Sequence, residues 1–248
     1  MKQYSRPSEL GEALSLLEQS DAVAVGGGTE VNSRDYEKPI AVIDLQALGL
    51  GGIELREPNA LHIGATATLQ SLLERADVPV ALRDAARREV PSSLRSQATV
   101  GGSVCGQRLD TEVVAALLLH EAVAVVLGPD GREKVPIADL INDRLPIEHE
   151  ILTAVTIDPS GVTASERTGR TRADRPIVAV YGRRRTNGTH RVVITGVVER
   201  PIVVDGEAAE VRKALEATAG FGDFRGSREY RRALAEVLTG RVLEELGR

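Results

Sequence analysis

Apolar and polar residues form two distinct patterns along the first 160 residues. Apolar residues at helical spacing predict a helix over residues 10–17, and residues 80–90 are predicted to form an amphipathic helix. A further helix is predicted over residues 111–120, with Asp110 as a candidate cap. Short apolar runs without that spacing predict buried strands at residues 22–25, 39–45, 122–127 and 150–159. Residues 60–75 are predicted to begin as a strand and to turn into a helix. We expect the first two strands to be parallel or close neighbours.

The last third of the chain places its strands before its helices. Two apolar runs flank Thr186-Asn187-Gly188-Thr189, and Asn-Gly favours the positive φ angles of a tight hairpin turn. A third apolar run, PIVVDG, and two helical segments at 207–219 and 227–246 follow. The polar stretch over residues 160–176, just before them, is predicted to be a boundary. This order of elements predicts an α+β fold.

Two runs of glycine stand out against this pattern. Gly26-Gly27-Gly28 follows the strand at residues 22–25, and Gly101-Gly102 lies in the stretch ATVGGSV. The first run is not G-x-G-x-x-G, and no Lys-Ser/Thr follows it as in a Walker loop. A plain tight turn is one interpretation of each run, and a cradle for a phosphate is the other. Two such loops together favour one extended diphosphate held from both sides.

Composition excludes several classes of function. Hydrophobic residues make up 42% of the 248 residues and charged residues 27%, as in ordinary globular proteins. A net charge of −5 and an aromatic content of 2% argue against nucleic-acid binding. We see no secretory signal, and the longest apolar stretch is interrupted by His120-Glu121. The sequence thus predicts a cytoplasmic protein without membrane insertion.

Few residues offer metal or redox chemistry. Cys105 is the only cysteine, so the chain alone cannot build a disulfide or an iron–sulfur site. The four histidines are scattered without zinc-ligand spacing, which predicts no metal site. We expect Cys105 to be a small residue near a loop. Arg183-Arg184-Arg185 and Arg191 are expected at a solvated hairpin end, with a docking surface for an acidic partner as the alternative.

In collinear order, the segments YSRPSELGEALSLL, AVAVGGGTEV, AVIDL, LHIGATATLQSLLE, LRSQATVGGSV and EILTAVTID resemble the flavin-binding subunit of the molybdenum hydroxylases. That family includes xanthine dehydrogenase and the medium subunit of aerobic CO dehydrogenase. The resemblance implies an FAD-binding (PCMH-type) domain over residues 1–160, with subdomains at about 1–55 and 56–160. It also implies a C-terminal domain of three strands and helices over 161–248, because GSREYRRALAEVLTGRVLEEL is similar to the end of that domain.

The same resemblance implies which residues hold FAD. The first loop would wrap the diphosphate with backbone N–H groups, and it comprises Val25, Gly26, Gly27, Gly28, Thr29, Glu30 and Val31. The second loop would be the other clamp, and it comprises Gly101, Gly102 and Ser103. Further contacts are implied for Ala65, Thr66, Arg95 and Asp110. For Asp110, the residue pattern itself favours a helix N-cap.

The implied function is electron transfer, with no catalytic side chain, because the flavin carries the redox step. Electrons would come from a large subunit with a molybdenum cofactor, through iron–sulfur clusters on a small subunit, and leave to NAD⁺, a quinone or O₂. The segment between Ser103 and Asp110 is shorter than is usual in the family. This departure leaves open a flavin-free structural or assembly relative that keeps the fold and the partner surface. A stand-alone flavin reductase is a third interpretation.

Overall fold

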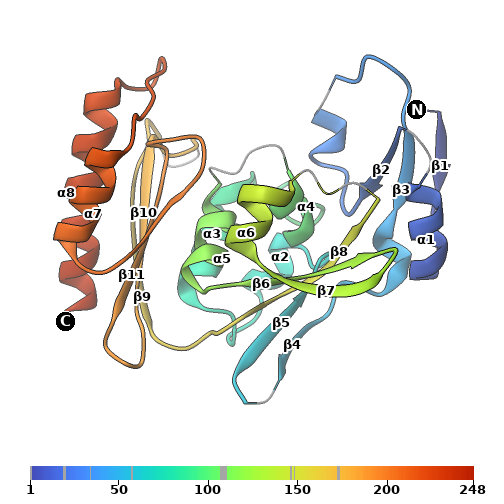
Figure 1. Cartoon of the computed structure of the whole chain (residues 1–248), viewed down its shortest axis with the longest axis horizontal. Coiled ribbons are helices and arrows are strands. Elements are labelled where there is room, and N and C mark those ends of the chain that lie inside the picture. Colours follow the sequence, from blue (N-terminus) through green and yellow to red (C-terminus); the bar gives the residue numbers. More distant parts are fainter. Residues whose placement is uncertain are drawn as a thin grey trace. The chain divides into compact units, whose positions relative to one another are not determined.

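The computed structural model mixes helices and sheets, which confirms the α+β class (Figure 1). It describes residues 2–18, 21–33, 35–56, 58–106, 111–145, 147, 149–171 and 174–248. The backbone divides into two compact units. Unit 1 comprises residues 1–75, 92–107 and 121–158, and unit 2 comprises residues 76–91, 108–120 and 159–248.

Unit 1 begins with a small parallel sheet in the order β1-β3-β2. Its strands are β1 (Gln3–Ser5), β2 (Ala22–Val25) and β3 (Ala41–Asp44). Helix α1 (Leu10–Leu17) packs on this sheet through Ala13 and Leu17, which join Ile43 in one apolar cluster. Short helices η1 (Val31–Ser33) and η2 (Leu45–Leu48) follow β2 and β3. The predicted parallel pairing of the strands at 22–25 and 39–45 is confirmed.

The second sheet of unit 1 has five antiparallel strands in the order β4-β5-β8-β6-β7. They are β4 (Ile53–Arg56), β5 (Ala60–Gly64), β6 (Val123–Gly128), β7 (Gly131–Pro136) and β8 (Ile151–Ile157). The helices that accompany this sheet are α2 (Leu69–Leu73), α4 (Val100–Cys105), α6 (Ile137–Asp139) and η3 (Leu140–Arg144). The strand-to-helix transition predicted within residues 60–75 is present as β5 followed by α2.

Unit 2 is built on a four-stranded antiparallel sheet in the order β12-β11-β10-β9. Its strands are β9 (Val162–Thr168), β10 (Val178–Arg184), β11 (His190–Thr195) and β12 (Ile202–Asp205). Helices α7 (Ala208–Ala217) and α8 (Arg228–Leu246) supply apolar side chains to the core on one face (Figure 1). Helices α3 (Val80–Glu89) and α5 (Glu112–Leu119) complete the unit, and Tyr181 of β10 donates to Glu112 of α5.

Three sequence expectations for unit 2 need correction. The polar stretch predicted as a boundary contains β9, so the C-terminal sheet has four strands instead of three. This edge strand pairs with β10 through its backbone, so it needs few apolar side chains. The helix cap predicted at Asp110 is supplied by Thr111, whose Oγ1 accepts from Val114 N at 3.2 Å. Asp110 itself lies outside the described residues.

The third correction concerns the arginines of the β10–β11 hairpin. Arg183 is buried and donates through Nε to the Ser160 carbonyl at 2.9 Å. Arg185 and Arg191 pair with Asp205 at 2.7 Å and 3.0 Å. Burial tends to raise the pKa of Asp205, but these two guanidinium groups outweigh it and hold the pKa below its usual value. The expected solvated cluster is therefore wrong for these three side chains.

Candidate functional site

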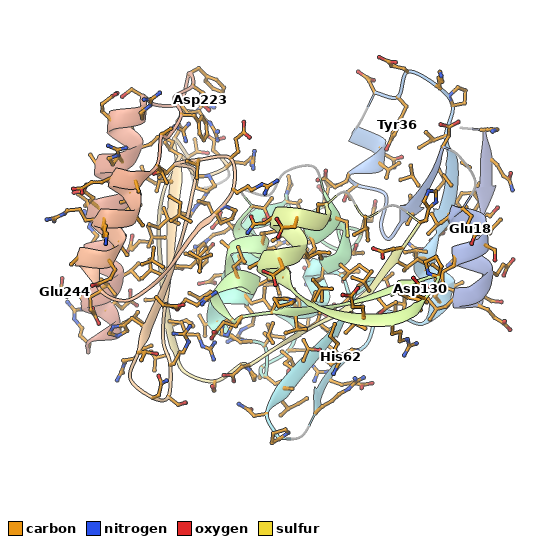
Figure 2. The ribbon with its side chains drawn as sticks, viewed as in Figure 1. Glu18, Tyr36, His62, Asp130, Asp223 and Glu244 are labelled. Carbon is orange, nitrogen blue, oxygen red and sulfur yellow. The ribbon has the colours of Figure 1, made fainter. Side chains whose placement is uncertain are left out.

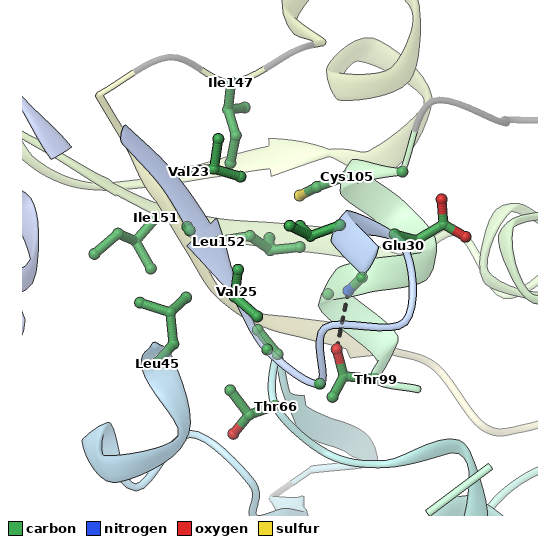
Figure 3. Close-up of a pocket in the computed structure, with 18 of the residues that line it drawn as sticks. Val23, Val25, Glu30, Leu45, Thr66, Thr99, Cys105, Ile147, Ile151 and Leu152 are labelled. Carbon is green, nitrogen blue, oxygen red and sulfur yellow. Dashed lines mark hydrogen bonds between the residues drawn. The ribbon is translucent and has the colours of Figure 1, made fainter. Parts of the chain in front are cut away.

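A cavity of about 490 Å³ lies in unit 1 (Figure 3). Strand β2 and the glycine loop after it form one wall, and residues of α4 and the start of β8 form others. The volume is in the range of pockets that hold cofactors or other small molecules. Both glycine runs that the sequence singled out border it, which brings together residues more than 70 positions apart in the chain.

The first loop comes close to the main chain of the segment that leads into the second. A Cβ atom on Gly27 would lie 1.6 Å from the Gln97 carbonyl oxygen, so only glycine fits at this position. Gly28 has a φ of +77°, which favours glycine for a different reason. Its carbonyl accepts from Asn32 N at 2.9 Å as η1 begins. The loop therefore needs glycine at this point because the main chain at Gln97 packs directly on its backbone.

Three backbone N–H groups of the first loop are candidates for contacts with a ligand. Those of Gly27, Gly28 and Thr29 find no hydrogen-bond acceptor among the described residues. Each of the three residues lines the cavity. Backbone N–H groups seldom stay without an acceptor, and a row of them attracts an anion such as a phosphate. The first loop thus fits the diphosphate of FAD.

The second loop has the opposite hydrogen bonding. It forms the first turn of α4, where Val100 N donates to the Ala67 carbonyl at 2.9 Å and Gly101 N to the Ala65 carbonyl at 2.8 Å. Gly102 N donates to Thr99 Oγ1 at 3.1 Å, which is the dashed line in Figure 3. Ser103 N completes the turn by donating to the Thr99 carbonyl. These four donors are already occupied, so this loop shapes the cavity wall and fastens α4 to its neighbours.

The structure brings most of the predicted site residues together. The cavity lining includes Val25, Gly26, Gly27, Gly28, Thr29, Glu30, Val31, Ala65, Thr66, Gly101 and Gly102. Arg95 and Ser103 are not part of the lining. The Nε atom of Arg95 is buried without a hydrogen-bond partner in the described part of the chain. Asp110 lies outside the described residues.

Sequence reasoning missed the apolar side of the cavity. It is lined by Leu45 after β3, by Ile147 in the segment before β8, and by Ile151 and Leu152 at the start of β8 (Figure 3). His149 also borders it and bonds through Nδ1 to the Leu17 carbonyl at 2.7 Å. No local motif marks these residues, because the fold brings them from distant segments. The small apolar residues of β2 were the one sequence feature that indicated close packing at this wall of the cavity.

Thr99 and Cys105 are two further lining residues outside the predicted set. The Thr99 side chain caps α4 and also contacts the first loop, since a Cβ atom on Gly26 would lie 2.6 Å from Thr99 Oγ1. Burial raises the pKa of the Cys105 thiol to about 12, so the thiol is protonated at neutral pH. A protonated thiol is a poor nucleophile, in line with the expectation that Cys105 is simply a small residue.

Metal ligation and membrane spanning are two further possibilities for the described ranges. They contain no group of three or more His, Cys, Asp or Glu side chains arranged to hold a metal ion. Within the same ranges, none of the helices has the length and apolar character needed to cross a bilayer. The cavity is thus the candidate functional site of unit 1.

Comparison with known proteins gives three kinds of similarity. The family model "FAD binding domain in molybdopterin dehydrogenase" matches residues 1–159. The chain is 28% identical to the uncharacterized protein YgfM of Escherichia coli K12 over 250 residues, covering 96% of this chain and 93% of that protein. It is 29% identical to the nicotinate dehydrogenase FAD-subunit of Eubacterium barkeri over 180 residues, covering 66% and 60% of the two chains.

A solved structure shares the fold over nearly the whole chain. It is a carbon monoxide dehydrogenase from Hydrogenophaga pseudoflava that lacks the Mo-pyranopterin moiety of its cofactor. The TM-score is 0.86 at 24% identity, and the match covers 98% of this chain and 96% of the other. The family match, which spans well over half of the chain, carries the assignment. The chain belongs to the FAD-binding domain family of the molybdopterin dehydrogenases, and its cofactor is FAD.

Proposed function

We propose that this chain is the FAD-carrying electron-transfer subunit of a molybdenum hydroxylase complex. It would take electrons from iron–sulfur clusters on a small subunit, which receives them from a large subunit with a molybdenum cofactor. It would pass them to an acceptor such as NAD⁺, a quinone or O₂. The family match and the likeness to a nicotinate dehydrogenase FAD-subunit support this proposal.

One observation of the site carries the proposal. Three consecutive backbone N–H groups, at Gly27, Gly28 and Thr29, border the cavity without acceptors among the described residues. A diphosphate supplies several anionic oxygens, which suits such a row of donors. Bound FAD supplies the redox chemistry, and the protein binds and orients it.

The other predicted residues take different roles in this proposal. Ala65 and Gly101 would shape the wall against which the cofactor lies, since Gly101 N already donates to the Ala65 carbonyl. Leu45, Ile151 and Leu152 would exclude water from one side of the cavity. Arg95 and Ser103 do not line the cavity, so they would support the lining residues without touching the cofactor. Asp110 keeps its proposed contact with the polar part of the cofactor.

The visible absorption spectrum of the purified chain tests the proposal. A flavin spectrum with close to one FAD per chain, retained through gel filtration, is the expected result. A colourless protein that takes up no FAD on reconstitution rejects it. If that colourless protein still assembles with the large and small subunits, the chain is a structural or assembly relative. NAD(P)H oxidation by the isolated chain would identify a stand-alone flavin reductase.

A further inference from the structure

Unit 2 exposes an aromatic side chain that its own core does not use. The chain has only six aromatic residues, two Phe and four Tyr, and both phenylalanines lie within Phe221–Phe224. Phe224 is 85% exposed, the largest value among the exposed large hydrophobic side chains of the described residues. Tyr230, in the first turn of α8, is also exposed, and its ring packs close to Gly226. A protein this poor in aromatic residues gains no stability by placing one in water.

The turn that carries Phe224 is held rigidly. Asp223 and Gly226 exchange two backbone hydrogen bonds of 3.1 Å, which close the turn, and Figure 2 marks Asp223 just before α8. The Asp223 carboxylate accepts from Arg225 N at 2.8 Å and from Arg225 Nε at 2.9 Å. Burial tends to raise the pKa of Asp223, but bonds from Arg225 and Arg231 outweigh it and lower the pKa to about 2. The carboxylate is therefore charged at any physiological pH.

A buried arginine fixes the base of the turn. Arg231 has no exposed surface, and its Nη1 donates to the carbonyls of Ile177 at 2.8 Å and Gly196 at 2.7 Å. Its Nε donates to the Gly226 carbonyl at 3.2 Å, and its guanidinium carbon lies 4.6 Å from the centre of the Phe221 ring. Because the loop is already ordered, binding through Phe224 would lose little conformational entropy.

One guanidinium group lies over the exposed ring, and a second exposed arginine follows the turn in sequence. The Arg170 guanidinium lies over the Phe224 ring at 5.6 Å, with 61% of its side chain exposed. Asp174 lies 3.6 Å from Arg170, close enough for an ion pair that an exposed setting makes weak. Arg228, the first residue of α8, is exposed as well. Exposed Phe and Tyr rings beside guanidinium groups are typical of the residues that dominate protein–protein binding energy.

We propose that the Asp223–Gly226 turn is a docking element, which inserts the Phe224 ring into an apolar pocket of a partner subunit with carboxylates at the pocket rim. These carboxylates would pair with Arg170 and Arg228. The inference rests on the proposed function, which supplies the partner subunits.

The test uses the full chain together with the large and iron–sulfur subunits from the same organism. Dissociation constants of the assembled complex are measured for the wild type and for Phe224→Ala, at two salt concentrations. Val162→Ala is the matched control, because Val162 is 50% exposed and lies at the Arg184 end of β9, whereas the turn adjoins Ile177 at the other end of β10. Phe224→Tyr keeps the aromatic ring, and Arg170→Gln removes the neighbouring charge.

We expect Phe224→Ala to weaken assembly at least about tenfold, while Val162→Ala and Phe224→Tyr stay within about threefold of wild type. Arg170→Gln should weaken assembly less and reduce its salt dependence. FAD content should not change in any variant, so it reports on the proposed function separately. Unchanged assembly by Phe224→Ala overturns the inference. The inference is also overturned if the wild-type chain holds FAD but does not bind these subunits. It is overturned as well if Phe224→Ala changes only the self-association of this chain.

Discussion

The two glycine loops of unit 1 look alike in sequence and differ in their hydrogen bonding. In the first, the N–H groups of Gly27, Gly28 and Thr29 have no acceptor among the described residues. In the second, Val100, Gly101, Gly102 and Ser103 all donate to neighbouring protein atoms. Both loops border one cavity. The comparison supports the proposal that the first loop binds the ligand while the second forms part of the cavity wall.

Glycine serves a different purpose in each loop. At Gly27 the missing side chain lets the first loop rest directly on the Gln97 carbonyl. In the second loop, glycine lets a helix begin close to the chain around Ala65. In neither case does the structure require that the glycine face a phosphate. The presence of a glycine-rich motif at a cofactor site therefore does not by itself show that the motif contacts the cofactor.

The largest effect is expected for Gly27→Ala. The added Cβ would meet the Gln97 carbonyl oxygen at 1.6 Å, so the first loop must move and its three N–H donors with it. Overpacking of this kind typically costs 1–3 kcal/mol, and the donors would also lose their alignment. We expect FAD affinity to fall roughly 100-fold, measured by flavin fluorescence titration of the apoprotein.

Gly11→Ala is the matched control for this change. Gly11 lies in α1 of the same unit, and no atom lies within 4 Å of a Cβ added there. Alanine is favoured over glycine in helices, so stability should rise slightly and FAD affinity should stay the same. Affinity of Gly27→Ala within threefold of wild type would contradict the assignment of the first loop.

A smaller effect is expected for Thr99→Val, which tests the link between the loops. Valine keeps the shape of the side chain but removes the oxygen that accepts from Gly102 N. Loss of such a cap usually costs about 1 kcal/mol, and it loosens the start of α4. We expect a fall in FAD affinity of roughly fivefold, with a lower melting temperature in differential scanning fluorimetry. Thr99→Ser keeps the acceptor and should behave like wild type in both measurements.

Much of the fold could be predicted because local pattern and tertiary structure agree. The apolar runs at β2, β3, β6 and β8, and the Asn-Gly turn between β10 and β11, carry their signals within a few residues. Strand β9 could not be predicted in this way. It lies at a sheet edge, where backbone pairing with β10 suffices and polar side chains such as Ser165 and Glu166 are tolerated.

The site could be predicted only in part. The residue pattern itself singled out both glycine loops, and resemblance to a known family implied that they hold FAD. The structure places nearly all of their residues at one cavity. The different roles of the two loops depend on which backbone N–H groups already have an acceptor within the protein. The sequence does not reveal this, because an acceptor such as the Ala65 carbonyl lies some 35 residues away in the chain. Ile151 and Leu152 were missed because an ordinary buried strand gives no sign of what it faces.

Gly102→Ala should have a still smaller effect on FAD affinity. This variant tests most directly whether the two loops have different roles. An added Cβ would lie 3.1 Å from Thr99 Oγ1 and meet nothing else within 4 Å, so a small shift of that side chain accommodates it. Because Gly102 N already donates to Thr99, we expect FAD affinity to change less than about threefold. An effect as large as that of Gly27→Ala would mean that the second loop also contacts the diphosphate, and the contrast between the loops would fail.

The smallest effect is expected at Cys105, which lies in the cavity wall at the end of α4. Burial raises the pKa of its thiol to about 12, above the usual value near 9, so the reactive thiolate is scarce below pH 10. Alkylation by iodoacetamide at pH 8 should thus be far slower than for a free cysteine, and it should rise steeply only above pH 10. Cys105→Ala should leave FAD affinity and its pH profile between 6 and 9 unchanged. Rapid alkylation at pH 8 that FAD prevents would show instead that the thiol is ionised and faces the ligand, and the wall formed by the second loop would then be more than a passive support.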